Sequence, residues 1–284
     1  MKLLPRPGFD QVLIFDACAA SVEDAVYREK LGRLRPSIQQ LSRDYSDRAS
    51  HKQLYTLAAS HHGDPEQIVY LDLNKKELIS LYETHMVKKP QGRRYYDEIL
   101  LSATFMKCTY CGFGQATTLD HFASKSRYPL HSIESSNLIP ACADCNKLLG
   151  SAPISEASQL PHPYFEDARI ELDSWLSARI LHTAPATVEY SVVSPPSWDE
   201  RLARRVRNYF RDLELHRRFS IEGNAAIVEI GDSLHMIEDS RDRATHLHSI
   251  ALAETNRRRN SWRAALCNSL ATSDWYIEIG YLGR

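Results

Sequence analysis

Two cysteine pairs frame the most informative stretch of this sequence: Cys108-Thr-Tyr-Cys111 and Cys142-Ala-Asp-Cys145. A CxxC pair lets two thiolates reach one ion from a tight turn, and two such pairs complete a closed tetrahedral site of four sulfur ligands. Gly112 directly follows the first pair, where the chain must turn sharply. A thioredoxin-like redox motif would leave one of the two pairs unexplained. We therefore expect a structural zinc site formed by Cys108, Cys111, Cys142 and Cys145.

The residues between and after the pairs predict a strand and a short helix. Thr117 to Phe122 is rich in apolar and β-branched residues, which indicates a short strand. Ala143 to Leu149 can form a helix that Gly150 ends. A strand, a hairpin return and a helix held together by zinc would form one small folded motif.

Three polar side chains of this motif have the chemistry of a second metal site. Asp120 and His121 lie at the end of the expected strand, and Asn146 directly follows the last cysteine. The motif would bring these three side chains together. Two oxygen ligands beside a histidine suit a hard divalent cation such as Mg²⁺, with a general base next to it.

This pattern resembles the HNH (ββα-metal) endonucleases, in the variant with four zinc-binding cysteines. The resemblance rests on CTYCG at 108–112, LDHFASKSRYP at 119–129 and NLIPACADCNK at 137–147. Two flanking stretches, 95–100 and 162–165, are similar to HNH proteins of bacterial anti-phage defence systems. In one departure from the pattern, two leucines at 148–149 stand where a basic residue is expected.

The resemblance implies a role for each matching residue. His121 would be the general base that activates water, and Asn137 would tie down the loop that orients it. Asp120 and Asn146 would hold the catalytic Mg²⁺, for which Mn²⁺ could substitute, while the zinc would do no chemistry. Cleavage would leave 5′-phosphate and 3′-hydroxyl ends. The residues that could contact nucleic-acid phosphate, with a solvated surface charge as an equal alternative, are Lys125, Arg127 and Lys147.

Composition limits the classes of protein to consider. The chain has 284 residues, of which 43% are hydrophobic and 25% are charged, values typical of globular proteins. Lysine and arginine total 35 against 36 acids, so the whole surface cannot coat nucleic acid nonspecifically. Residues 88–151, however, carry eight basic residues and five acidic ones, which is the sign that nucleic acid requires. The apolar stretch Val12–Phe15 is too short for a signal peptide, and no transmembrane run exists, so we expect a cytoplasmic protein.

The flanks of the motif predict further helices. We expect a helical region over 1–90, an HNH core with the four-cysteine zinc site over 91–155, and a mostly helical region over 156–284. In the first region, Ser21 to Asp24 resembles a capping box, and Asn74 can cap a helix. In the third region, we expect a helix over 170–181, a strand over 187–193 and an amphipathic helix from Leu202 to Leu213. Arginine clusters at 204–211 and 257–259 could be solvated or could bind DNA or a partner.

The predicted fold is α+β and mainly helical, with a zinc-stapled ββα-metal core between helical flanks. The predicted function is Mg²⁺-dependent hydrolysis of DNA with low sequence specificity, as the effector of a bacterial anti-phage system. No nucleotide-binding loop is found, so a separately encoded ATPase or sensor subunit is the expected partner. Two alternatives stay open: a zinc-stapled binding module without catalysis, and a toxin-like subunit that acts on RNA.

Overall fold

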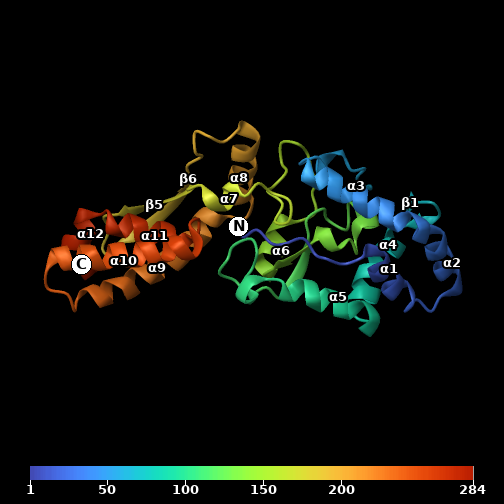
Figure 1. The fold of residues 1–284 in the computed structure, drawn as a ribbon, viewed down its shortest axis with the longest axis horizontal. Coiled ribbons are helices and arrows are strands. Elements are labelled where there is room, and N and C mark those ends of the chain that lie inside the picture. Colours follow the sequence, from blue (N-terminus) through green and yellow to red (C-terminus); the bar gives the residue numbers. More distant parts are fainter. Residues whose placement is uncertain (284) are drawn as a thin grey trace. The chain divides into compact units, whose positions relative to one another are not determined.

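The computed structural model describes residues 1–283 and confirms a mainly helical α+β fold (Figure 1). The chain forms two compact units, which we call the N-terminal unit (Lys2–Glu166) and the C-terminal unit (Asp167 onward). The expected regions 1–90 and 91–155 both lie within the N-terminal unit. Within residues 1–283, no helix combines the length and the apolar character that crossing a membrane requires.

The N-terminal unit contains six α-helices and two antiparallel two-stranded sheets among its described residues, together with shorter 3₁₀ and π segments. The elements are α1 (Gln11–Ala19), α2 (Ala25–Leu34), α3 (Ile38–Ser50), β1 (Ile68–Tyr70), β2 (Leu73–Asn74), α4 (Lys75–Ser80), the π-helix η3 (Leu81–Met86), α5 (Pro90–Leu101), β3 (Thr118–His121), β4 (Leu138–Ala141) and α6 (Ala143–Leu149).

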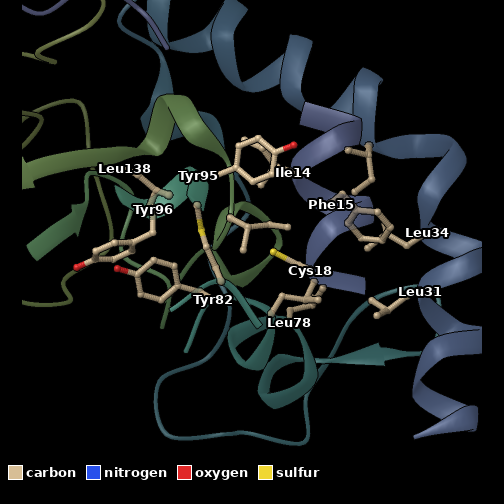
Figure 2. Packing of buried hydrophobic residues seen from close by; sticks show 14 of the residues in the cluster. Ile14, Phe15, Cys18, Leu31, Leu34, Leu78, Tyr82, Tyr95, Tyr96 and Leu138 are labelled. Atoms are coloured by element: carbon tan, nitrogen blue, oxygen red, sulfur yellow. The ribbon is translucent and has the colours of Figure 1, made fainter. Parts of the chain in front are cut away.

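One hydrophobic core joins the helices of this unit to the β3–β4 hairpin. Figure 2 shows side chains of α1, α2, α4 and α5 in one cluster that also contains Leu138, which is the first residue of β4. Leu119 of β3 belongs to the same cluster, and both leucines are buried. Truncating a buried leucine to alanine typically costs about 2–5 kcal/mol of stability. The hairpin is therefore held by the preceding helices as well as by the zinc motif.

The expected strand and helix of the motif are confirmed. β3 pairs antiparallel with β4, so that His121 lies opposite Leu138 and Thr118 lies opposite Ala141. Cys142 caps α6, because its Sγ accepts a hydrogen bond from the backbone N–H of Cys145. Gly150, with φ of +60°, ends the helix in a conformation that favours glycine.

Two helix starts were predicted in the N-terminal region, of which one is confirmed and the other is wrong. Asn74 caps α4 as expected, and Glu77 completes a capping box. The cap expected at Ser21 is wrong, because α2 begins after Asp24, whose carboxylate accepts from the N–H of Tyr27. The Ser21 hydroxyl is instead engaged with the carbonyl of Cys18 and with Nδ1 of His85.

The C-terminal unit is built from helices beside one hairpin. In Figure 1, α9 (Leu215–Leu234) and α11 (Trp262–Ala271) run beside this hairpin, with α11 packed on β5 (Leu176–Leu181) and α9 on β6 (Thr187–Val192), while α10 (Ser240–Arg258) packs on α11. The elements are α7 (Arg169–Leu172), β5 (Leu176–Leu181), β6 (Thr187–Val192), α8 (Glu200–Asp212), α9 (Leu215–Leu234), α10 (Ser240–Arg258), α11 (Trp262–Ala271) and α12 (Asp274–Glu278).

In this unit, the expected strand and amphipathic helix are confirmed as β6 and α8, but the helix expected over 170–181 is wrong. Only α7 is helical there, and the following residues form β5, which pairs with β6 along its whole length. The side chain of Asn260 holds the start of this strand by accepting hydrogen bonds from the N–H groups of Trp175 and Leu176. The local sequence pattern did not reveal these long-range partners.

Candidate active site and zinc centre

The four predicted zinc ligands form one buried cluster. The Sγ atoms of Cys108, Cys111, Cys142 and Cys145 all lie within 4.8 Å of one another, and none of the four forms a disulfide. Gly114 is packed so closely that a Cβ atom there would lie 3.0 Å from the Sγ of Cys142. Four converging thiols without a disulfide are the ligand set of a closed structural zinc site. The structure thus brings together the cysteines that the spacing predicted.

Asp120 is a buried carboxyl group on β3. Its Oδ2 accepts a hydrogen bond of 3.0 Å from the hydroxyl of Tyr110, which lies between the first two cysteines. Loss of solvation raises the pKa of Asp120 to about 7, and the hydrogen bond from Tyr110 only partly opposes this rise. Because burying a carboxylate without a countercharge is costly, a nearby divalent cation would stabilise its ionised form.

His121, the next residue, is buried and held by one ring nitrogen. Its Nε2 lies 2.8 Å from the carbonyl oxygen of Ser132, so Nε2 carries the hydrogen and Nδ1 has the free lone pair. The ring also packs edge-on against Tyr82, with 4.3 Å between centroids. Burial, followed by the charge of Lys125, lowers the pKa of His121 to about 3. The imidazole is therefore neutral at pH 7, the state that can accept a proton.

Asn146 reaches β3 from the second turn of α6. Its Nδ2 lies 3.5 Å from Oγ1 of Thr118, a weak contact that directs the amide toward the strand. Thr118 and Asp120 share a face of β3, since side chains alternate along a strand, whereas His121 lies on the other face. Within residues 1–283, Oδ1 of Asn146 makes no hydrogen bond, so it is available as a ligand. The donor set of Asp120 and Asn146 therefore fits a hard cation.

Asn137 is completely buried, and its side chain ties together the loop that follows His121. Its Oδ1 accepts from the N–H of Ala123 at 2.7 Å, and its Nδ2 donates to the carbonyls of Ala123 and His131. Ser132, whose carbonyl binds His121, lies in the same loop. The contacts are therefore those that a loop-orienting asparagine needs.

The three predicted phosphate contacts differ in their surroundings. Lys125 is half-buried, lies 3.7 Å from a carboxylate oxygen of Glu83, and faces the ring of Tyr82. Arg127 is also half-buried, and its Nε is a buried donor for which the described residues offer no acceptor. Lys147 is exposed in the last turn of α6. Among the described residues, Arg127 thus keeps a buried donor that a phosphate could accept from.

Sequence reasoning missed several groups that complete this site. Tyr110 was visible inside the first cysteine pair, but only the fold shows that its hydroxyl meets Asp120. The Ser132 carbonyl is a backbone group, so no residue type could have signalled it. Tyr45 of α3 donates to Oδ1 of Asn137 across 92 positions of sequence, a separation that no local pattern reveals.

Comparison with known proteins agrees with this geometry. The model of the HNH endonuclease family matches residues 108–151. The chain is also similar to protein ea31 of Escherichia phage lambda, with 28% identity over 236 residues that cover 81% of this chain and 79% of that protein. No solved structure matches the chain. The zinc-type cysteine cluster, the buried Asp120–His121 pair and the family match together identify residues 108–151 as an HNH endonuclease domain with four clustered cysteines.

Proposed function

We propose that this protein is a Mg²⁺-dependent endonuclease that hydrolyses phosphodiester bonds of DNA with low intrinsic sequence specificity. The observation that carries the proposal is the end of β3, where a buried carboxyl group is followed by a neutral imidazole with a free Nδ1. A module that only binds nucleic acid has no need for these two groups at these positions. Within the HNH domain they have the chemistry of a metal ligand and a proton acceptor.

In the proposed reaction, His121 accepts the proton of the attacking water at Nδ1 while its Nε2–H stays on the Ser132 carbonyl. The Asn137 amide keeps that carbonyl in place by holding the loop. Asp120 and Asn146 would hold the cation, which when bound neutralises charge on the scissile phosphate and on the leaving oxygen. Lys125, Arg127 and Lys147 would contact flanking phosphates.

The proposal is tested by incubating the zinc-loaded protein with supercoiled plasmid, with and without added Mg²⁺. We expect nicked and linear products only with Mg²⁺, and none from His121→Ala. Parallel reactions with linear duplex, single-stranded DNA and RNA identify the preferred substrate. Binding without cleavage under every metal condition would favour the non-catalytic module, and cleavage of RNA alone would favour the toxin-like alternative.

A metal titration separates the two proposed roles. Asn146→Ala weakens cation binding, so part of its activity should return at high Mg²⁺ or with Mn²⁺. Asp120→Ala should behave in the same way but with a larger loss, because it removes a charged ligand. His121→Ala should not respond to metal, because its defect is in proton transfer. Equal rescue of all three variants would mean that base and ligand are wrongly assigned.

The regulation we propose is association with a separately encoded ATPase or sensor subunit in anti-phage defence. Its support is that a free, nonspecific nuclease would damage the host genome, while the described chain extends far beyond the matched residues 108–151 on both sides. Purification from the native operon, followed by mass measurement, tests this idea. A lone and constitutively active monomer would contradict it.

A further inference from the structure

Two buried side chains from outside the HNH domain contact the loop that orients His121. Tyr45 lies in α3, and His162 lies after the domain; both are buried. The Tyr45 hydroxyl lies 2.9 Å from Oδ1 of Asn137 and 3.3 Å from Nε2 of His162. These contacts join three segments that are distant in sequence.

The direction of each hydrogen bond in this group follows from its neighbours. Nδ1 of His162 accepts from the backbone N–H of Tyr164 at 3.2 Å, so the ring hydrogen is on Nε2. His162 therefore donates to the oxygen of Tyr45, and Tyr45 donates its only hydrogen to Oδ1 of Asn137. Each donor in the chain polarises the next one, which strengthens the final bond to Asn137.

Ring contacts hold the same loop at two further points. The ring of His162 packs against Phe122, the residue that follows His121, with 4.1 Å between centroids. The ring of Tyr45 lies 5.1 Å from that of His131, whose carbonyl accepts from Asn137. The two side chains therefore contact the start of the loop, its middle and the asparagine at its end.

We propose that Tyr45 and His162 are positioning residues of the nuclease site, which act on His121 through Asn137 and the loop over 122–137. The link to cleavage rests on the proposed function, whereas the link to loop order does not. If the loop loosens, the Ser132 carbonyl loses its fixed position and the His121 ring is no longer held in one orientation. A displaced base slows the chemical step without removing any substrate contact.

The test compares Tyr45→Phe with the matched control Tyr276→Phe. Tyr276 in the C-terminal unit is equally buried, and its hydroxyl donates to the carbonyl of Ile227 at 2.9 Å. Each variant loses one buried hydroxyl, so both should be destabilised, and Tyr45→Phe should lose more because its hydroxyl makes two hydrogen bonds and that of Tyr276 makes one. Only Tyr45→Phe should lower kcat, by on the order of tenfold with KM unchanged, because one hydrogen bond contributes roughly that factor.

Amide hydrogen exchange provides a readout that does not depend on cleavage. In Tyr45→Phe, exchange of the Ala123 amide and of the loop over 122–137 should become faster, with zinc content unchanged. In Tyr276→Phe these amides should exchange as in the wild type. Unchanged loop exchange in Tyr45→Phe, or equal loss of kcat in both variants, would overturn the inference. A wild-type protein that cleaves nothing would overturn the proposed function instead, and the exchange result would still decide the effect on the loop.

Discussion

The two units differ most in the kind of polar group that they bury. The N-terminal unit buries four histidines, and loss of solvation lowers the pKa of each of them: His85, His121, His131 and His162. It also buries Asp120 and Glu134, whose pKa values are raised to about 7 for the same reason. In the described part of the C-terminal unit, no histidine or carboxylate is buried.

The buried polar side chains in the described part of the C-terminal unit are arginines and asparagines. Arg243 donates to the carbonyls of Ile237, Glu238 and Ile277, and Asn260 holds backbone groups at the start of β5. These side chains therefore provide hydrogen-bond partners for backbone groups. The N-terminal unit therefore carries the cost of desolvating titratable side chains, and the described part of the C-terminal unit buries no histidine or carboxylate that would add such a cost.

Removal of the zinc site should cause the largest loss of stability, and this loss should fall on the N-terminal unit. Structural zinc binding in zinc-finger peptides is worth about 10–16 kcal/mol at pH 7, so Cys108→Ser should destabilise the N-terminal unit by several kcal/mol. The matched control is Cys267→Ser, which alters an equally buried thiol of the C-terminal unit outside the cluster. Metal analysis and regional hydrogen exchange measure both effects. Loss of zinc from Cys108→Ser with unchanged exchange in the N-terminal unit would contradict a structural role.

Replacement of the proposed base should affect rate more than stability. Removing a positioned general base typically costs about 10²–10⁴-fold in rate, so we expect that loss in kcat for His121→Ala, with zinc content and DNA affinity retained. The control is Asn260→Ala, which removes buried hydrogen bonds of the C-terminal unit and should lower its stability while the kcat of folded molecules is kept. Undiminished cleavage by His121→Ala would end the assignment of this residue as the base.

The sequence predicted the parts of the site that lie close together along the chain. Cysteine spacing predicted the zinc cluster, and the residues around Asp120 and Asn146 predicted the strand and the short helix. Each of these features depends on local geometry. It did not reveal Tyr45 or the strand character of β5, because both depend on partners more than 80 positions away or in another element. Long-range hydrogen bonds leave no periodic trace in a single sequence.

A smaller effect is expected from pH, again in the N-terminal unit. The pKa of His131 is lowered by burial from 6.5 to about 4, so the folded unit keeps it neutral while the unfolded chain takes up a proton below pH 6.5. Its contribution to stability is thus present above pH 6.5 and is lost as the pH falls toward 4. His131→Phe keeps the ring against Tyr45 but removes this titration. The loss of unfolding free energy between pH 6.5 and 4.5 should therefore shrink by about 2–3 kcal/mol.

The change of unfolding free energy with pH is compared between the wild type and His131→Phe, because other groups also titrate. Acid protonates the zinc thiolates, and the contribution of Glu134 to stability changes with pH in the opposite direction to that of His131. Glu134 has a raised pKa, so its contribution is present below pH 4.5 and is lost as the pH rises through 7. His216→Phe, at an exposed position of the C-terminal unit, is the control for the same exchange of side chains at the surface. Equal pH profiles for the wild type and His131→Phe would mean that burial does not shift this histidine.

The smallest effect should come from replacing exposed cations of the two units, which tests which unit contacts the nucleic acid. Lys147 is exposed on α6 of the HNH domain, and Arg241 is exposed at the start of α10 in the C-terminal unit. If Lys147 contacts phosphate, Lys147→Ala should raise KM a few-fold and reduce the slope of log KM against log salt concentration by about one, with kcat unchanged. Arg241→Ala should change neither quantity. Cleavage assays at several salt concentrations measure both slopes, and equal effects of the two variants would show that DNA meets the C-terminal unit as well as the HNH domain.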